Sequence, residues 1–439
     1  MKKSTDKKLA AQQSNLMSAI KLHQQGDLAK AEKRYRRILK THPQHPDALH
    51  YLGVLMHQNG NHEGAIIMIE RALAENSNYV DAHNNLGNIY KELGEMANAE
   101  KHYRKAVLIN DDYVSAHVNL AVVLKELTDY QQALHHSDIA IKLSANNADI
   151  YSNRAVIYRK VGDFDAAIDA FKHALLIDEK HVSAYRGLSR IHRMLGQEKE
   201  ALCVIEKWLE IAPSDPIAQH MFASHSGHIS PDRASDGFVI ETFNDFASSF
   251  DESLKKLQYQ APKLVNNAIA DIFGSRSKKI EILDAGCGTG LCGSFLAPYA
   301  NRLIGVDLSP KMLDKAKATK KYSQLICEEL GQYLSSKKSV FDLVVSADTL
   351  CYFGELSTIF KHAFMALKSN GYLIFTVEHE TGNMNEFVLN THGRYSHSEA
   401  YVRSQLHTAG FEVEAVSFDT LRKERGEPVG GIVVIAVKN

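Results

Sequence analysis

One glycine-rich stretch, "ILDAGCGTG" at residues 282–290, combines residue types and spacing that suggest chemistry. An aliphatic run ends in Asp284, and glycines follow at positions 286, 288, 290 and 293. A glycine turn between a strand and a helix allows the backbone to approach a bound nucleotide closely. Counted from Gly288, the spacing also satisfies G-x-G-x-x-G, the dinucleotide fingerprint. The stretch therefore predicts a nucleotide site and leaves two cofactor classes to be distinguished.

Asp284 distinguishes these cofactors. In a dinucleotide site the loop receives a pyrophosphate, which a carboxylate ~4 Å away would repel by about 4 kcal/mol at an effective dielectric constant of about 20. The same carboxylate suits a ligand that carries an ammonium and a sulfonium. Leu291 also breaks the G-x-G-x-x-G count when it starts from Gly286. Asp307, in "LIGVDLS", is suited to bonding a ribose diol, but both cofactor classes carry one.

The elements that must position these residues alternate between strands and helices from residue 280 onwards. The strand-like runs are "KIEILDAG", "RLIGVDLS", "SQLICEEL", "FDLVVSAD", "GYLIFTVE", "FEVEAVSF" and "GGIVVIAVK". Helical stretches separate the earlier runs, as in "SPKMLDKAKATKK" with Ser309 as N-cap and Pro310 in its first turn. This alternation predicts a doubly wound, Rossmann-like parallel sheet with its ligand at the carboxyl ends of the strands. The last two runs lack an intervening helix, which predicts an antiparallel final strand.

The first half of the chain repeats with a period of 34 residues. Alanines stand at 31, 65, 99, 133, 167 and 201, and five residues before each is a glycine, replaced once by Thr128. Small residues recur in the same register at 19, 53, 87, 121, 155 and 189, as is needed where helices cross closely. Six units predict an all-α solenoid over residues 12–227, including a capping helix at 215–227.

A second feature with the same period is a row of asparagines, Asn85, Asn119 and Asn153. This position is expected to face the concave groove. A carboxamide both donates and accepts hydrogen bonds, so the row is predicted to bind the backbone of a peptide. Tyr51 and Gly187 occupy the position in the flanking repeats and limit the row to the middle three. The alternative is that these asparagines form only a solvated polar face.

Residues 228–273 connect the solenoid to the glycine loop and are predicted to be a linker and a helical lid. Phe243, Phe246 and Phe250 recur at helical spacing and are interpreted as covering the edge of the next domain's core. The alternative is a lid that covers the cofactor and excludes water. Tyr259 fits either role.

Both halves resemble known families. "AHNNLGNIYKELGEMANAEKHYRKAVLIN" (82–110) is similar to the tetratricopeptide repeat, and "A-x-x-N-L-G/A" resembles the peptide-binding repeats of O-GlcNAc transferase. The predicted second domain, residues 274–439, resembles the class I S-adenosylmethionine-dependent methyltransferases. The resemblance covers nearly all of 280–439. "ILDAGCGTG" matches the first motif of that family, "LIGVDLSPKML" the second, "ICEELGQYL" the third, and "FDLVVSADTLCYFG" the fourth strand with its loop. The whole chain looks like the predicted methyltransferases fused to tetratricopeptide repeats.

The methyltransferase resemblance implies S-adenosyl-L-methionine as cofactor and assigns residues to it. It places Asp284, Gly286, Gly288 and Gly290 around the methionine moiety and Asp307 on the ribose hydroxyls. The rest of the expected set lies near the adenine or in the lid: Leu308, Met312, Glu329, Leu330 and Tyr259.

The methyl acceptor is less defined by the sequence. No N/D-P-P-Y/F follows the fourth strand, where "SADTLCY" stands, which argues against amide or adenine amino acceptors. Cys351 lacks an adjacent proline and is interpreted as a buried inert thiol, and Cys287 and Cys292 as packing residues. No catalytic residue is singled out, since positioning supplies most of the rate in such a transfer. The candidate bases all follow the fifth strand: Glu378, His379, His392, Arg394, Tyr395 and His397.

Composition narrows the class of protein. The net charge of −1 gives no electrostatic case for a nucleic-acid partner. The basic start "MKKSTDKK" is not followed by an apolar core, and no run is long enough to span a bilayer. Five cysteines show no disulfide or zinc spacing, so no metal site is predicted and a cytoplasmic location is expected.

The resulting prediction is a methyltransferase that acts on a protein or peptide-borne acceptor recruited by the repeat groove. A second possibility keeps the chemistry but makes the acceptor a sugar or small metabolite, with the repeats only docking a partner. A third is a non-catalytic adaptor.

Overall fold

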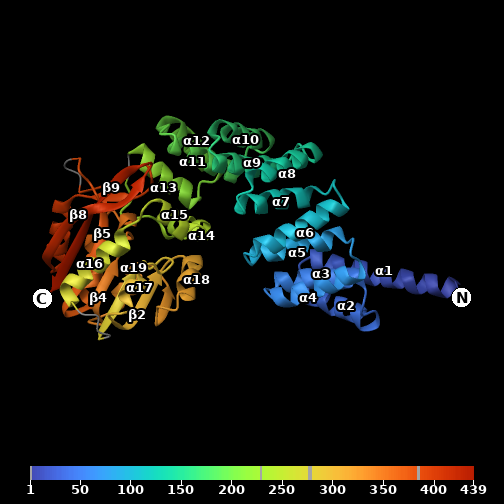
Figure 1. Ribbon diagram of the computed structural model, residues 1–439, viewed down its shortest axis with the longest axis horizontal. Helices are drawn as coiled ribbons and strands as arrows, with labels where there is room; N and C mark the ends of the chain where they lie inside the picture. The colour runs from blue at the N-terminus through green and yellow to red at the C-terminus, as the bar shows by residue number, and fades with distance from the viewer. Residues whose placement is uncertain (1, 228–229, 275–278, 383–385) are drawn as a thin grey trace. The chain divides into compact units, whose positions relative to one another are not determined.

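The computed structural model describes residues 2–227, 230–274, 279–382 and 386–439, and the chain divides into two compact units, Met1–Ile191 and His192–Asn439 (Figure 1). The division falls within α11 (Val182–Met194), the first helix of the sixth repeat. The second helix of that repeat and the predicted capping helix therefore belong to the unit that contains the sheet. Positions 228 and 229, where the predicted linker starts, lie outside the described residues.

The first unit is a stack of antiparallel helix pairs, which confirms the predicted solenoid. Its helices before α11 are α1 (Lys2–Gln24), α2 (Leu28–Thr41), α3 (Pro46–Gln58), α4 (His62–Glu75), α5 (Val80–Glu92), α6 (Met96–Ile109), α7 (Val114–Glu126), α8 (Tyr130–Leu143), α9 (Ala148–Val161) and α10 (Phe164–Ile177). The periodic alanines from Ala31 to Ala167 are completely buried between helices. At Gly87 an added Cβ would lie 2.6 Å from the Tyr103 ring, so the close crossing of α5 and α6 requires glycine.

The turns inside the repeats use left-handed backbone. Glycines with φ between +72° and +92° occupy this position at 26, 60, 94, 162 and 196. In the fourth repeat Thr128 adopts the same conformation, with φ +65°. A β-branched side chain is unfavourable there, so this turn keeps its shape against a local conformational cost.

The second unit begins with helices that precede the sheet in the chain. These are α12 (Glu198–Ile211), α13 (Pro216–Ser226), α14 (Asp236–Phe246), α15 (Phe250–Lys256) and α16 (Ala261–Phe273). His220 of α13 lies 2.9 Å from the carbonyl oxygen of Gly393, and Arg425 donates to the carbonyl of Arg193 at 2.6 Å. The end of the repeat array thus packs on the sheet domain through specific polar contacts.

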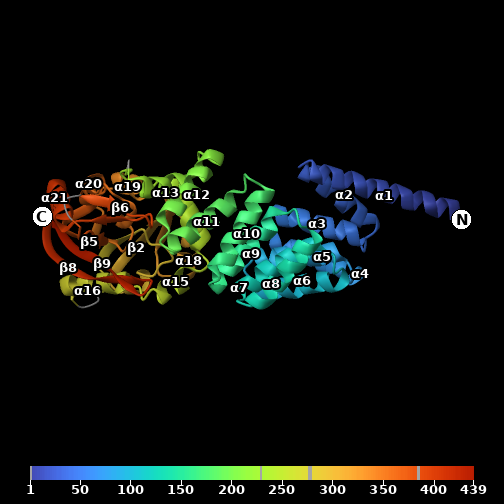
Figure 2. The same ribbon diagram turned by 90° about the horizontal axis from the view of Figure 1, so that it is seen from above.

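The sheet has the order β3-β2-β1-β4-β5-β7-β6. Strand β9 lies beside β5 and β8 in Figure 2 and pairs antiparallel with both. Strands β1 to β5 are parallel, which confirms the doubly wound sheet and its antiparallel final strand. The strands are β1 (Ile280–Ala285), β2 (Ala300–Asp307), β3 (Gln324–Cys327), β4 (Phe341–Ser346), β5 (Leu367–His379), β6 (Phe387–Leu389), β7 (Tyr395–His397), β8 (Glu412–Glu424) and β9 (Glu427–Lys438). The connecting helices are α17 (Gly293–Leu296), α18 (Pro310–Ala318), α19 (Leu330–Ser335), the 3-10 helix η1 (Leu350–Tyr352), α20 (Ser357–Ala366) and α21 (Glu399–Ala409).

Helices cover both faces of the sheet. One buried cluster joins the strands to α19, α20 and α21, and another joins them to α16 and α17. The short hairpin β6–β7 was not predicted, because three-residue strands leave little periodic signal in a sequence. It lies beside the carboxyl end of β5, where a substrate approaches in a parallel sheet.

Candidate active site

The glycine loop follows β1 directly and is built on left-handed residues. Gly286, Gly288 and Gly290 have φ of +79°, +52° and +88°. A Cβ at Gly286 would lie 2.1 Å from Oγ1 of Thr349, so packing against the segment after β4 also excludes a side chain there. A Cβ at Gly288 would meet only Cε1 of Phe250, at 4.0 Å. The space beside Gly288 is therefore open to a ligand up to the ring of Phe250.

Asp307 ends β2 and holds the loop. Its Oδ2 accepts a hydrogen bond of 2.9 Å from the backbone N–H of Gly288, and its Oδ1 accepts one of 2.8 Å from that of Ser309. Burial raises the pKa of this carboxyl, and the backbone N–H groups counteract the rise. Each carboxylate oxygen retains a lone pair after these bonds, so Asp307 has capacity to accept from ligand hydroxyls.

Asp284 is buried at the end of β1. The hydroxyl of Tyr322 donates to its Oδ2 at 2.7 Å. Burial raises the pKa of Asp284 to about 7; the Tyr322 hydrogen bond lowers it, and the charge of Asp307 raises it further. A cation beside Asp284 would reverse this shift, because an opposite charge favours the ionised carboxylate. Tyr322 also touches the loop, since Cβ atoms added at Gly290 and Gly293 would lie about 3 Å from its ring.

Helices α14 and α15 contact the loop and the end of β2. Oδ1 of Asn244 accepts a 2.8 Å hydrogen bond from Oγ of Ser309, the N-cap of α18. Oγ1 of Thr289 donates to Oδ1 of Asp251 at 2.5 Å. These bonds fix the segment beside the space next to Gly288.

The three phenylalanines of this segment pack on one another. Phe250 makes edge contacts with Phe246 and Phe243, with ring centroids 5.4 and 6.0 Å apart. Phe243 also contacts Tyr352 of η1 at 5.3 Å. The aromatic cluster therefore links the helices before the sheet to the loop after β4.

The residues expected near the adenine lie at the carboxyl ends of β2 and β3. Met312 and Leu330 are buried, and Leu308 is half-buried. Glu329 also caps α19, because its Oε2 accepts a 2.7 Å hydrogen bond from the N–H of Gln332. The sequence motif did not reveal this capping role.

Tyr259 lies in a different part of the site. Its neighbours Leu257 and Gln260 are hydrogen-bonded to the backbone of β8, at Lys423 and Leu421. Burial raises the pKa of Tyr259 well above its usual value, the charge of Asp348 adds to the rise, and Arg422 opposes it. These charges place Tyr259 near the ends of β4 and β8.

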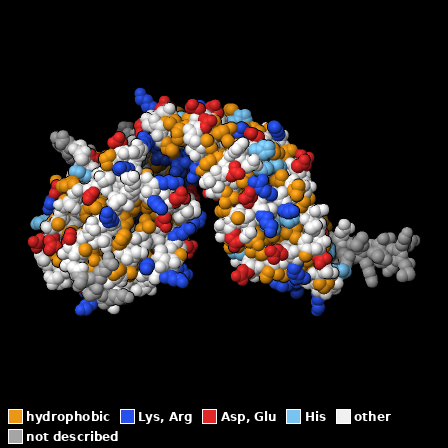
Figure 3. Space-filling view, in the orientation of Figure 1, with side chains coloured by type: hydrophobic (Ala, Val, Ile, Leu, Met, Phe, Trp, Pro, Cys, Tyr) orange, Lys and Arg blue, Asp and Glu red, His pale blue; other side chains and the backbone are white. Residues whose placement is uncertain are grey.

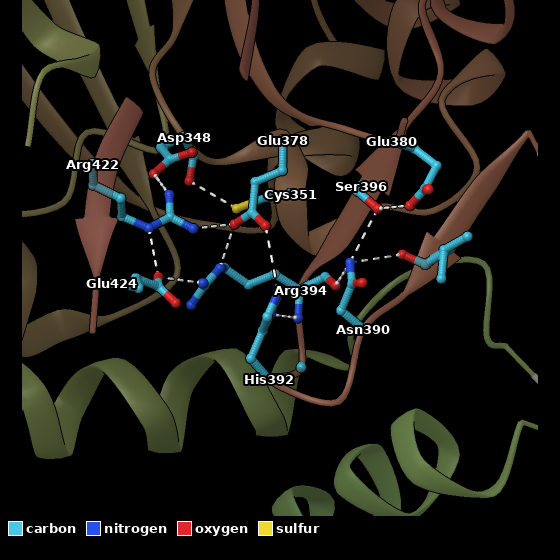
Figure 4. Close-up of polar contacts among 12 residues, drawn as sticks. Asp348, Cys351, Glu378, Glu380, Asn390, His392, Arg394, Ser396, Arg422 and Glu424 are labelled. Atoms are coloured by element: carbon cyan, nitrogen blue, oxygen red, sulfur yellow. Dashed lines mark hydrogen bonds and ion pairs between the residues drawn. The ribbon is translucent and has the colours of Figure 1, made fainter. Parts of the chain in front are cut away.

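A network of charged side chains occupies the carboxyl ends of β4 and β5 (Figure 4). The guanidinium of Arg422 on β8 donates to Asp348 at 2.6 Å, to Glu424 at 2.7 Å and to Glu378. Arg394 donates to Glu378 and to Glu424, both at 2.5 Å. Burial opposes ionisation of Glu378, but Arg394 and Arg422 lower its pKa to about 2. Three carboxylates thus surround two guanidinium groups.

Asp348 is the member of this network with an unused polar atom. Its Oδ2 pairs with Arg422, while its Oδ1 is buried and has no hydrogen-bond partner in the part of the chain that the structure describes. Asp348 also has φ +58°, in the left-handed region. A strained residue with an unpaired buried oxygen is a feature of functional sites.

Only part of this network was among the candidates from the sequence. Glu378, His392 and Arg394 belong to it, with Nε2 of His392 3.5 Å from Glu378. His379 instead contacts the Phe418 ring at 4.8 Å, and His397 is buried against the carbonyl of Gly354.

Several functional candidates were missed or are structural. No functional role was predicted for four residues of the site: Tyr322, Asp348, Arg422 and Glu424. The one sequence signal among them was the position of Asp348, which lies in "SADTLCY" directly after β4. Tyr395 is buried, and its hydroxyl donates to the carbonyl of Pro231 at 2.7 Å. Burial raises the pKa of three thiols well above the usual value: Cys287, Cys292 and Cys351.

The asparagine row of the repeats is half-buried. Nδ2 of Asn85 donates to Nε2 of His50 at 2.9 Å, and Nδ2 of Asn119 donates to Oδ1 of Asn84 at 3.1 Å. Each of these bonds joins a repeat to the one before it. In the fourth repeat of the solenoid, Val118 occupies the position of His50 and Asn84 in the second and third repeats, and it offers Asn153 no side-chain acceptor.

Family profiles match both parts of the chain. Profiles described as "Tetratricopeptide repeat" match residues 22–86, 80–113 and 146–214, and one described as "Methyltransferase domain" matches 283–375, from β1 to β5. The chain therefore contains a methyltransferase domain that follows tetratricopeptide repeats.

The chain is similar to curated proteins that carry different names. A malonyl-[acyl-carrier protein] O-methyltransferase of Priestia megaterium is 32% identical over 164 residues, 36% of this chain and 55% of the relative. An 18S rRNA (guanine-N(7))-methyltransferase of Bos taurus is 33% identical over 84 residues, 19% of this chain and 30% of the relative. Methyltransferase-like protein 27 of Homo sapiens is 34% identical over 113 residues, 25% of this chain and 46% of the relative.

The chain spans about half the length, or less, of these relatives. Among solved structures, the crystal structure of MamA is 25% identical, covers 37% of this chain and 95% of its own, and has a TM-score of 0.35. None of the helices in the described ranges is both long and apolar enough to pass through a membrane.

Proposed function

We propose that this methyltransferase uses S-adenosyl-L-methionine to methylate an acceptor that is a protein or is carried by a peptide, and that the helical repeats recruit this acceptor. The observation that carries the cofactor assignment is the joint geometry of Asp284, Gly288 and Asp307. Asp284 supplies a buried carboxylate, and the backbone of Gly288 has open space beside it. Asp307 supplies a second carboxylate, which already accepts a hydrogen bond from the N–H of Gly288.

The residues present fit this cofactor. The pKa of about 7 at Asp284 reflects a burial cost that a nearby cation relieves, and an ammonium or sulfonium is such a cation. Asp307 has lone pairs for a ribose diol, and the space beside Gly288 is bounded by the apolar ring of Phe250. When bound, the cofactor supplies an electrophilic methyl group on its sulfonium.

The charged network is proposed to bind and orient the acceptor. Oδ1 of Asp348 is suited to accept a hydrogen bond from an N–H or O–H of the acceptor group. Arg422, with three carboxylate partners, holds Asp348 in place. Methyl transfer depends mainly on alignment of methyl and nucleophile, so a rigid wall at the ends of β4 and β5 supplies what the reaction needs.

Recruitment through the repeats rests on the asparagine row. The Nδ2 atoms of Asn85 and Asn119 donate hydrogen bonds to the preceding repeat. Oδ1 of Asn85 is left to accept from the N–H groups of a peptide. Oδ1 of Asn119 also receives a long contact of 3.4 Å from Nζ of Lys91. On the face of the repeats seen in Figure 3, Lys and Arg are interspersed with Asp and Glu. Such a mixed surface supports recognition of a backbone in preference to recognition by net charge.

The names of the relatives support both a carrier-protein acceptor and an RNA acceptor, so they do not select one. The test is transfer of labelled methyl from S-adenosylmethionine into a lysate separated into macromolecules and small molecules. We expect label in protein with the wild-type chain and none with Asp307→Ala. Label only in metabolites would overturn the protein acceptor and favour the small-molecule alternative. No label in any fraction would favour the adaptor.

A further inference from the structure

We propose that His57, His62 and Glu92 form a binding site for a zinc-like divalent transition metal in the helical repeats. The site is independent of the methyltransferase domain and of the proposed function. One ligand atom from each of the three residues lies within 4.8 Å of the other two.

The three side chains converge from two adjacent repeats. His57 stands near the end of α3, His62 is the first residue of α4, and Glu92 is the last of α5. The Nδ1 atoms of the two histidines are 2.9 Å apart. The Nε2 atoms of His57 and His62 lie 3.2 and 4.0 Å from carboxylate oxygens of Glu92. Both imidazoles therefore face each other and one carboxylate.

One ligand atom from each residue lies close enough to the other two for tetrahedral coordination after small side-chain rotations, since none of the three is more than 4.8 Å from another. Zinc binds imidazole nitrogen and carboxylate oxygen at about 2.0–2.2 Å, which places neighbouring ligand atoms about 3.3–3.5 Å apart. The side chains of His57 and His62 are 21% and 28% exposed, while that of Glu92 is 60% exposed and free to adjust. Two imidazoles and a carboxylate suit Zn²⁺, Co²⁺ or Ni²⁺ better than Mg²⁺ or Ca²⁺. A fourth position would remain for water or for a ligand from a partner.

The neighbouring repeats show what is particular to this place. His23 and Gln58 are the equivalents of His57 and Glu92 in the preceding pair of repeats. Nε2 of His23 lies 2.8 Å from Oε1 of Gln58, so the contact between these two positions recurs as a brace, a polar contact that joins one repeat to the next. The position of His62, however, is Leu28 in that repeat and Met96 in the following one. Two differences, His62 in place of Leu28 and Glu92 in place of Gln58, thus turn a brace into a set of three metal ligands.

A bound metal would connect α3, α4 and α5 and so stabilise the junction of the second and third repeats. The sequence showed no metal-ligand spacing, because Glu92 is separated from the histidines by a full helix pair and comes close only in the folded stack. His62→Leu places at this position the residue found in the preceding repeat, so it tests the site with little change to the fold.

The experiment uses the full chain freed of metal by a chelator, titrated with Zn²⁺ by calorimetry and with Co²⁺ by visible absorption. We expect one Zn²⁺ site that is weakened at least tenfold in His62→Leu and in Glu92→Gln, with loss of the tetrahedral Co²⁺ bands. His23→Ala, which changes the matching histidine of the preceding repeat, should bind as the wild type does.

Circular dichroism checks that each variant is folded, and Glu92→Gln serves if His62→Leu unfolds. Equal Zn²⁺ affinity in the wild type and both variants would overturn the proposal, because the metal would then be bound elsewhere among the histidines. Absence of Co²⁺ bands in the wild type would overturn it as well, and the three residues would form only a hydrogen-bonded brace.

Discussion

The backbone N–H of Gly288 donates a 2.9 Å hydrogen bond to Oδ2 of Asp307, which joins the glycine loop after β1 to the acid that ends β2. The bond is internal to the protein, so the loop is held in shape before a ligand arrives. Pre-organisation of this kind lowers the conformational cost of binding. In the proposed function Asp307 therefore has two roles, as a support of the loop and as a contact for the ribose.

The first prediction concerns Asp307. Asp307→Ala removes up to two charge-assisted contacts with the ribose, each worth about 1.5–3 kcal/mol, and the support of Gly288. Calorimetry with S-adenosylhomocysteine should show at least a tenfold loss of affinity. Asp314→Ala, an exposed aspartate on the next helix, is the control and should bind normally. Unchanged affinity in Asp307→Ala would refute the assignment, and tight binding of NADH would refute the reading of Asp284.

The second prediction is a pH dependence from Asp284. Its pKa is about 7 without a ligand, and a cationic cofactor lowers that pKa in the complex. Below pH 7 the Asp284 carboxyl must therefore lose a proton when the cofactor binds. The affinity for S-adenosylmethionine should fall about tenfold for each unit that the pH is lowered below 7, and it should be constant above pH 7.

A matched variant checks the sign of this effect. The Tyr322 hydrogen bond lowers the pKa of Asp284, so Tyr322→Phe should raise that pKa and move the break in the affinity profile to higher pH. Asp284→Asn should abolish the break. A wild-type profile that is flat from pH 5.5 to 8.5 would show that Asp284 does not face the cationic part of the ligand.

The third prediction concerns the asparagine row. Replacing Asn85, Asn119 and Asn153 together by Ala should cost about 2–4 kcal/mol of acceptor binding, or about two to three decades of affinity. Cofactor affinity should not change, because its residues lie in the other unit. Methylation of a macromolecular acceptor at subsaturating concentration is the measurement.

Single variants separate binding from stability. Asn119→Ala also removes the hydrogen bond to Asn84, so about 0.5–1.5 kcal/mol of unfolding free energy should be lost with it. Asn153→Ala should affect only the acceptor, since Val118 offers its side chain no partner. Wild-type methylation rates in the triple variant would leave the row as a brace between repeats.

The fourth prediction uses the internal symmetry of the turns. Thr128 has φ +65°, where the other repeats have glycine, so Thr128→Gly should relieve backbone strain. Glycine also increases the conformational entropy of the unfolded chain, and the net stabilisation of the solenoid should be about 0.5–1 kcal/mol. Gly94→Thr makes the reverse change at φ +79° and should destabilise by a similar amount or more. Urea unfolding of both variants against the wild type measures the two effects, and equal stability of all three would show that this turn carries no strain.

Much of the fold could be predicted because the evidence for it is local or periodic. The 34-residue spacing of Ala31 and its equivalents defines close crossings, and the same alanines are buried in the structure. The loop after β1 and Asp307 lie in short motifs, so both could be assigned before any contact was known. Even the antiparallel β9 followed from the missing helix between two strand-like runs.

The rest of the site could not be predicted because its parts meet only through the topology of the sheet. Arg422 reaches Asp348 and Glu378 from a strand far along the chain, and no spacing connects them. Glu329 looked like a ligand contact and also caps a helix, because local backbone demands compete for a polar side chain. The pairing of Asn119 with Asn84 was likewise hidden, since a position in a repeat does not reveal its partner in the next.

The segment 230–235 has a practical consequence for the isolation of a catalytic fragment. The carbonyl of Asp232 accepts from the N–H groups of Gly354 and Glu355, and the N–H of Ala234 donates to the carbonyl of Tyr352, each at 2.8 Å. A recombinant chain cut just before β1, at the edge of the recognisable motifs, would lose these partners and uncover the loop after β4. A cloning boundary that keeps α11 whole lies instead before Val182, inside what the sequence presents as the repeat array.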